Sequence, residues 1–320
     1  MNLKPVIGTI AFITGIAPAL AAVPARMFPG RLYVTVQAAN AVEVLPQGTL
    51  WRGITAAHYD DISPNGRFLV VTSAQPGRAY VLNAHTGKHL AVFQLGKATQ
   101  GVKISPNNHW ALVVEPGPGR VAVINLKTLK LVKTIAVGKT PHNVRFTHSG
   151  RLAYVTLQGG GGVAVINMKQ MRKVAEIPVP GLTGPHNLDL SDHDRLLWVR
   201  DIGDHVAVVD LATRKVIHLI KVGQGHAGID VIPGGRYVFT GAIADDVVDV
   251  INPKTYRVVK RIKVGNGPHG VRASRDGHWV YAEVTGTNKV AVIDTHTLKV
   301  VKQIPTKGGF PFWGALRGNE

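Results

Sequence analysis

Histidines that recur at a fixed spacing are the residues of this chain best suited to chemistry. The sequence contains a repeat of about 42 residues, and one position of that repeat is rich in histidine. Neutral imidazole is a good ligand for copper, zinc and iron. If the fold brings these side chains together, we expect them to hold such a metal or a haem-like group. The predicted metal ligands are His58, His142, His186, His226 and His269.

The same position breaks the pattern in three repeats. It holds Gln100 in the second repeat, Ala227 directly after His226 in the fifth, and Phe312 near the C-terminus. A structural interpretation of the column stays open beside the metal, because a Pro-His turn between repeats recurs for reasons of packing alone. An organic ligand or an anion is a further interpretation.

Charged residues occupy a second position, three residues after the first. Their signs alternate along the chain, from Asp61 and Lys103 to Arg145 and Asp189 and then to Asp230 and Arg272. Buried charges are costly unless they are paired, so this alternation predicts salt bridges between neighbouring repeats. The alternative is a polar channel that orients a zwitterionic ligand. We therefore name a set of candidate ligand-binding residues: Gln100, Arg145, Asp189, Asp230, Arg272 and Phe312.

Each repeat contains four short runs rich in Val, Ile, Tyr and Thr. In the third repeat these runs span 142–147, 151–158, 163–167 and 173–179, and turn residues such as Ser63–Gly66 separate the runs in other repeats. Four strands in about 42 residues are typical of one blade of a β-propeller. The predicted fold class is therefore all-β, a seven-bladed β-propeller of four-stranded antiparallel blades.

The two ends of the chain complete the seventh blade. Residues 30–54 supply three strands and residues 310–317 supply the innermost one, which closes the ring. The first strand of each repeat then lines the central channel, and its start lies at one mouth of that channel. The predicted metal ligands therefore converge on a single axis. We expect one propeller domain over residues 22–320.

Two segments carry a family resemblance. Val121–Val144 (VAVINLKTLKLVKTIAVGKTPHNV) and Val290–Ile304 (VAVIDTHTLKVVKQI), with strand cores such as AYVT at 153–156, resemble the YVTN-repeat β-propellers of the YncE-like type. More distantly, the chain is similar to the propeller domain that carries haem d1. The resemblance implies a secreted propeller, and it implies the fold far more specifically than the function.

The N-terminus resembles a secretory signal. Lys4 precedes the apolar run Val6–Leu20, and Ala19-Leu20-Ala21 fits a cleavage site, so residues 1–21 are the predicted signal peptide. An uncleaved anchor is the alternative. We expect a periplasmic or secreted protein with no membrane span in the mature chain.

Composition adds a strong positive charge. The formal net charge is +18, with 37 Lys and Arg against 19 Asp and Glu, and cysteine is absent. The basic residues follow the fourth, outermost strands, which predicts a basic rim that binds an acidic protein partner or a polyanion, including single-stranded nucleic acid. Lysine on such strands also prevents edge-to-edge pairing, which is the structural alternative. We expect a monomer.

Enzyme motifs do not decide the function. Two G-x-G-x-x-G matches, Gly223–Gly228 and Gly265–Gly270, precede predicted strands and not helices, so they are turns rather than dinucleotide sites. Acidic residues in two neighbouring repeats suggest solvated loops or a calcium site: Asp201, Asp204, Asp245 and Asp246. The leading expectation is a binding protein that acts through the channel mouth. The alternatives are a metal- or haem-dependent redox or accessory protein, a lactonase-like enzyme, and a basic-rim binder.

Overall fold

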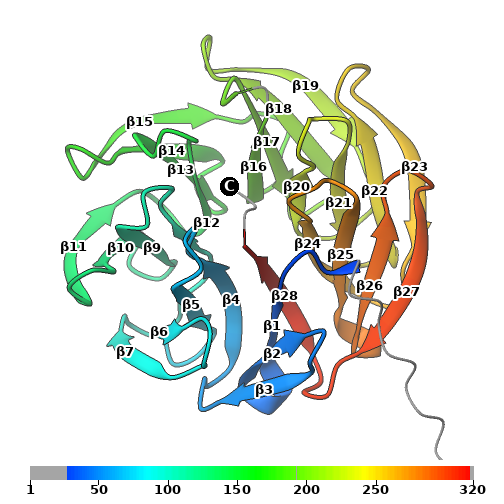
Figure 1. Cartoon of the computed structure of the whole chain (residues 1–320). Coiled ribbons are helices and arrows are strands. Elements are labelled where there is room, and N and C mark those ends of the chain that lie inside the picture. Colours follow the sequence, from blue (N-terminus) through cyan, green and yellow to red (C-terminus); the bar gives the residue numbers. More distant parts are fainter. Residues whose placement is uncertain (1–26, 192, 318–320) are drawn as a thin grey trace, which may run out of the picture.

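The chain forms a ring of seven four-stranded antiparallel sheets around a central channel (Figure 1). The structure is a computed structural model and describes residues 27–191 and 193–317. The expected signal peptide therefore lies outside the described residues. Two short 3-10 turns interrupt the strands, η2 (Gln37–Ala39) and η3 (Thr285–Thr287), and among the described residues no helix is long and apolar enough to cross a membrane. The predicted fold class is confirmed.

The blades follow the chain in order, and each runs from the channel outward. Blade 1 contains β28 (Pro311–Leu316), β1 (Leu32–Val36), β2 (Ala41–Leu45) and β3 (Thr49–Arg52). Blade 2 contains β4 (Ala57–Ile62), β5 (Phe68–Ser73), β6 (Arg78–Asn83) and β7 (His89–Gln94). Blade 3 contains β8 (Val102–Ile104), β9 (Trp110–Glu115), β10 (Arg120–Asn125) and β11 (Lys130–Ala136).

The remaining blades repeat this order. Blade 4 contains β12 (Pro141–Phe146), β13 (Leu152–Leu157), β14 (Gly162–Asn167) and β15 (Arg172–Pro178). Blade 5 contains β16 (Pro185–Ser191), β17 (Leu196–Asp201), β18 (His205–Asp210) and β19 (Lys215–Lys221). Blade 6 contains β20 (Ile229–Val231), β21 (Val238–Ala242), β22 (Val247–Asn252) and β23 (Arg257–Lys263). Blade 7 contains β24 (Pro268–Ala273), β25 (Trp279–Val284), β26 (Lys289–Asp294) and β27 (Lys299–Pro305).

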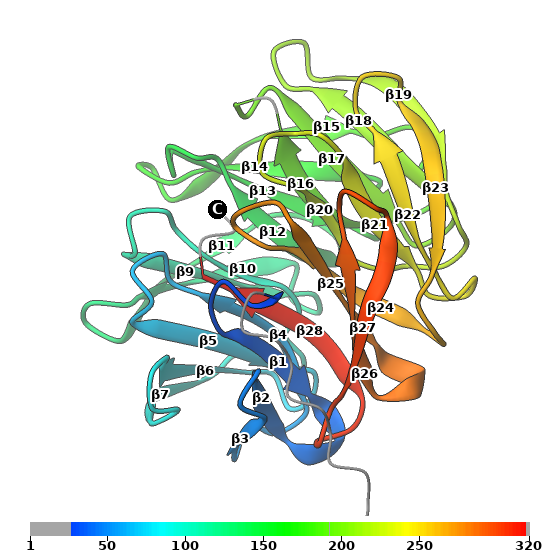
Figure 2. The same cartoon turned by 45° about the vertical axis from the view of Figure 1, so that its right-hand side comes forward.

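The ring is closed by pairing the two ends of the described chain. Strand β28 pairs antiparallel with β1, with Leu32 opposite Leu316 and Thr35 opposite Trp313. The turned view in Figure 2 shows β28 alongside β1, and β28 also contacts β4 and β24, the inner strands of the two adjacent blades. This closure removes an open sheet edge, as the sequence predicted.

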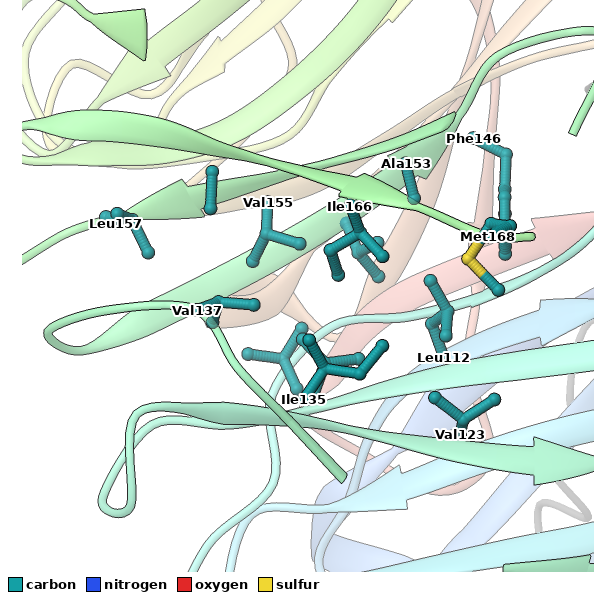
Figure 3. Packing of buried hydrophobic residues seen from close by; sticks show 14 residues of the cluster. Leu112, Val123, Ile135, Val137, Phe146, Ala153, Val155, Leu157, Ile166 and Met168 are labelled. Atoms are coloured by element: carbon teal, nitrogen blue, oxygen red, sulfur yellow. The ribbon is translucent and has the colours of Figure 1, made fainter. Parts of the chain in front are cut away.

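The core lies between neighbouring blades. Apolar residues on both faces of the three inner strands are buried, whereas the fourth strands bury little: β11 has a single buried residue, Ile135. Figure 3 shows the layer between blades 3 and 4, where Leu112 and Val123 face Val155 and Ile166. Each fully buried side chain of this kind contributes about 1.5–3 kcal/mol, so the blades hold one another in place and fix the geometry of the channel.

Candidate functional site

Four histidines of the column occupy the second residue of an inner strand. They are His58 in β4, His142 in β12, His186 in β16 and His269 in β24, and all four are buried. His226 lies in the turn before β20 and is half-buried. Because the inner strands surround the channel (Figure 1), these residues meet at one of its mouths.

A β-bulge accompanies each of the buried histidines. In β12 the pairing with β13 shifts between Pro141 and Val144, and the same irregularity occurs in β4, β16 and β24. A bulge leaves a residue out of the ladder and changes the direction of its side chain. The bulge is therefore a feature of this strand position and not of a Pro-His pair, because Ala57 precedes His58 in β4. It interrupts the ladder beside each of these imidazoles.

Three of the five predicted metal ligands form a cluster. The ligand atoms of His186, His226 and His269 all lie within 4.8 Å of one another. Their ring centroids are 4.7 Å apart for His186 and His226 and 5.2 Å apart for His226 and His269. Three imidazole nitrogens at such spacing match the ligand set of a transition metal that keeps an open coordination position.

Hydrogen bonds orient two of the mouth histidines. Nδ1 of His269 donates to the backbone oxygen of Phe312 at 3.1 Å, and Nδ1 of His142 donates to the backbone oxygen of His186 at 3.1 Å. Each bond assigns the proton to Nδ1, because a carbonyl oxygen only accepts. Nε2 of each ring then carries a lone pair, which is the arrangement that protein metal ligands commonly have.

His186 is the exceptional member of the cluster. It is 5% exposed, and neither of its ring nitrogens has a hydrogen-bond partner among the described residues. Its ring stacks on that of His142, with centroids 3.5 Å apart. A buried polar group without a partner costs about 1–3 kcal/mol, so this ring is held in place at a cost that a bound ligand would remove.

Burial keeps these imidazoles neutral. It lowers the pKa of His58 to about 4 and that of His142 to about 3, and it lowers the pKa of His186, His226 and His269 as well. Mutual repulsion between the histidines and the nearby Arg200 guanidinium act in the same direction. Neutral imidazole is the form that coordinates metal ions.

His58 has a different environment from the cluster. Gln37 donates from Nε2 to its Nδ1 at 2.6 Å, and its Nε2 donates to Oε1 of Gln100 at 2.9 Å. Both nitrogens are therefore engaged by amides, which leaves no lone pair for a metal. Phe312 stacks on His58 and on His269, with centroid distances of 4.1 and 3.7 Å. At the mouth, Gln100 therefore hydrogen-bonds to His58, and Phe312 packs against His58 and His269.

An aromatic layer lies next to the histidines. The Tyr59 ring is 5.8 Å from His142 and 4.4 Å from Trp313, measured between centroids. Trp313 in turn lies against the Arg272 guanidinium, 4.3 Å from its ring centroid. Along the channel, the histidines at the mouth are therefore followed by the aromatic rings and then by the charged residues.

The charged position forms the ion pairs that the alternating signs predict. Lys103 lies 2.8 Å from Asp61, Arg145 lies 2.8 Å from Asp189, and Arg272 lies 3.5 Å from Asp230. Arg145 also reaches Asp230 at 2.9 Å, so it links blade 4 both to blade 5 and to blade 6, the blade beyond it. The aspartates accept backbone N–H groups of the next blade as well: Asp61 from Ile104, Asp189 from Val231 and Asp230 from Ala273. These contacts hold the ring together.

The acidic loop residues are used locally. Asp201 accepts hydrogen bonds from Thr183 and pairs with Arg200, while Asp204 pairs with His205. Asp245 and Asp246 accept the backbone N–H groups of Gln224 and Gly267. These carboxylates therefore stabilise the turns between strands. The two G-x-G-x-x-G segments precede β20 and β24, so they are turns between blades, as predicted.

Several residues of the mouth carry no repeat signal. Gln37 lies in η2 of the closing blade, and Asn143 donates to Asn187, which donates to the backbone oxygen of Ala227 at 2.8 Å. The two asparagines follow His142 and His186 directly in the sequence, so their place in the repeat was the available signal. Gln37 had none, because it belongs to the closing blade, blade 1, whose sequence departs from the repeat.

Comparisons with known proteins agree with this architecture. The family model described as Cytochrome D1 heme domain matches residues 197–310, about a third of the chain. This part of the chain is similar to a cytochrome D1 heme domain. The d1-type resemblance expected from the sequence is confirmed there, and the YVTN-repeat resemblance stays a prediction. No curated protein sequence matches the chain.

Solved structures of similar shape are numerous, and their sequences are distant. A functionally unknown protein from Desulfotomaculum acetoxidans DSM 771 has a TM-score of 0.78 at 14% identity and covers 91% of this chain and 100% of its own. The Kuenenia stuttgartiensis hydrazine synthase has a TM-score of 0.74 at 19% sequence identity, and the match covers 82% of this chain and 90% of its own. The dihydro-heme d1 dehydrogenase NirN in complex with DHE has a TM-score of 0.68 at 20% sequence identity, and the match covers 90% of this chain and 75% of its own. Such identities establish the shared fold alone.

Proposed function

We propose that this chain is a secreted, periplasmic binding propeller that holds a transition-metal ion at the histidine-lined mouth of its channel. The observation that carries the proposal is the convergence of His186, His226 and His269 within 4.8 Å. The ligand set is all nitrogen and neutral, which suits copper, zinc or iron. His226, the half-buried member, gives an ion access from solvent.

The unpartnered ring of His186 supports the same proposal. Its nitrogens have no hydrogen-bond partner among the described residues, although the residue is almost fully buried. A purely structural histidine is expected to bond a neighbouring blade, as His142 and His58 do. His186 therefore differs from the members of the column that a packing role explains.

The family match favours a second candidate ligand, a haem-type tetrapyrrole. Its fit to the mouth is poor, because the rings are packed against one another: His142 stacks on His186 at 3.5 Å, and Phe312 stacks on His269 at 3.7 Å. A macrocycle cannot enter between rings at these distances. The packing therefore favours a bare metal ion over a tetrapyrrole.

A metal titration of the full-length, metal-free protein tests the proposal. We expect one equivalent of Zn²⁺ or Cu²⁺ to bind, with His186→Ala, His226→Ala and His269→Ala each weakening the affinity by at least about tenfold. His296→Ala is the matched control, because His296 is exposed on the outer part of blade 7. Wild-type affinity no tighter than that of the His226→Ala variant contradicts the proposal. A visible absorption spectrum after addition of haem distinguishes the second candidate.

A further inference from the structure

A separate cavity opens at the other end of the channel. It has a volume of about 660 Å³ and extends over the inner strands of blades 3 to 6. Its floor includes Arg145, which lies three residues after His142 and hence about 10 Å further along β12. The volume is within the range of sites for small organic ligands.

Arg145 presents unused hydrogen-bond donors to this cavity. Its side chain is 9% exposed, its Nε faces Asp189 at 2.8 Å, and its Nη2 donates to Asp230 at 2.9 Å. Its Nη1 makes no hydrogen bond within the described residues. This nitrogen is also not fully enclosed by protein atoms. Since Arg145 lines the cavity, Nη1 is the part of its guanidinium that remains able to donate to a ligand there.

The carboxylates of the floor are already occupied. Asp189 accepts the backbone N–H groups of Leu190 and Val231, and Asp230 accepts that of Ala273 and the Arg272 guanidinium. Ion pairs balance the charges of the floor, because Lys103 pairs with Asp61, Arg145 with Asp189 and Arg272 with Asp230. Lys254, which also lines the cavity, adds one positive charge at its rim. The cavity is therefore suited to one negative charge.

The walls are suited to an apolar body. Blades 4, 5 and 6 contribute side chains that surround the space above the charged floor, and the Tyr256 ring lies at its edge. The apolar lining consists of Phe146, Leu190, Leu196, Val231 and Ile232. An inorganic anion or a sugar would leave these walls in contact with water, which disfavours those ligand classes.

We propose that this cavity binds a small organic carboxylate with an aromatic or branched apolar body. The carboxylate accepts from Nη1 of Arg145, and the apolar body lies against the walls. This site is independent of the histidine mouth, because Tyr59 and Trp313 lie between the histidines and Arg272. The two sites can therefore be occupied or lost separately.

Isothermal titration of full-length protein with 3-phenylpropionate tests this proposal. We expect saturable binding of one equivalent. The neutral amide, 3-phenylpropionamide, is expected to bind at least about tenfold more weakly, because it lacks the charge that Arg145 recognises. Acetate, which lacks the apolar body, is expected to bind at least about tenfold more weakly as well. Equal binding of acid and amide, or no binding at millimolar concentration, overturns the proposal.

Two variants locate the site. Arg145→Lys retains a cation beside Asp189 and Asp230 but loses the planar fork, so the affinity should fall about tenfold. Lys254→Glu reverses an exposed rim charge without touching the ion pairs, and it should weaken binding about two- to fivefold even if the first variant folds poorly. Lys260→Glu, on the outer strand β23, is the matched control and should bind like wild type. Wild-type affinity in Lys254→Glu together with unchanged affinity in Arg145→Lys contradicts the assignment.

Discussion

His269 donates its Nδ1 proton to the backbone oxygen of Phe312, 3.1 Å away, so the strand that closes the ring also orients a histidine of the metal cluster. Phe312 belongs to β28, which pairs with β1 from the other end of the described chain. The same residue stacks its ring on His58 and His269. Closure of the propeller and geometry of the mouth are therefore linked.

Replacement of Trp313 tests how much the closing strand β28 contributes to the stability of the propeller. Its side chain is 2% exposed and packs on Tyr59 and under Arg272. Trp313→Ala should lower the free energy of unfolding by about 3–5 kcal/mol, measured by urea denaturation. Trp51→Ala is the control, because Trp51 is half-buried on β3, and its loss should be clearly smaller. Equal losses in the two variants contradict a special role for β28.

The buried Arg200 should contribute more to the free energy of unfolding than the exposed Arg195. It is fully buried, pairs with Asp201 at 2.8 Å, and donates to the backbone oxygens of Gly223 and Gly225. Arg200→Met leaves a buried carboxylate without its cation, so thermal or urea unfolding should show a loss of about 3–5 kcal/mol. Arg195→Met removes an exposed guanidinium 3.7 Å from Asp210 and should cost below about 1 kcal/mol. Similar costs for both variants disagree with this prediction.

Glu283 should make the protein less stable as the pH rises. It is fully buried without a hydrogen-bond partner among the described residues, near Asp60 and Arg272, and burial raises its pKa to about 8. The unfolded chain releases this proton near pH 4.3, so between about pH 4.3 and 8 the folded state binds more protons than the unfolded state. The free energy of unfolding should therefore fall with pH across this window.

Glu283→Gln removes this titration. The difference in unfolding free energy between variant and wild type should change by on the order of 1 kcal/mol per pH unit over that window. Urea denaturation at pH 5, 6, 7 and 8 measures it. The profile of the variant should be flatter but still sloped, because burial raises the pKa of Asp60 too. Parallel profiles contradict an ionisable, buried Glu283.

His58 distinguishes a three-histidine site from a five-histidine one. Both of its nitrogens are bonded to glutamine amides, so His58→Phe should leave the zinc affinity within about threefold of wild type. Phenylalanine also retains an aromatic ring against Phe312. A competition assay with a chromophoric chelator measures the affinity. A loss as large as that of His269→Ala argues that His58 is a ligand.

The fold could be predicted from the sequence because the repeat and the strand pattern report the same architecture. The alternation of Asp61, Lys103, Arg145 and Asp189 likewise predicted ion pairs, since charges that the repeat places side by side must pair when buried. Position within the repeat was sufficient in both cases.

The division of the histidines could not be predicted in this way. Equivalent positions make His58 and His186 look alike, yet Gln37 and Gln100 engage one while the other has no partner among the described residues. Gln37 comes from an irregular turn, and His226 lies one residue out of register with the column. Such differences depend on side-chain packing at one mouth, which a repeat alignment averages away.

Anomalous diffraction from crystals of the full-length protein grown with Zn²⁺ tests the central claim most directly. We predict one strong zinc peak at the channel mouth, about 2.0–2.1 Å from a ring nitrogen of each of His186, His226 and His269. His58 should keep its contacts with Gln37 and Gln100 in the same crystals. Absence of a peak among these three histidines, with zinc bound at surface sites alone, contradicts the claim.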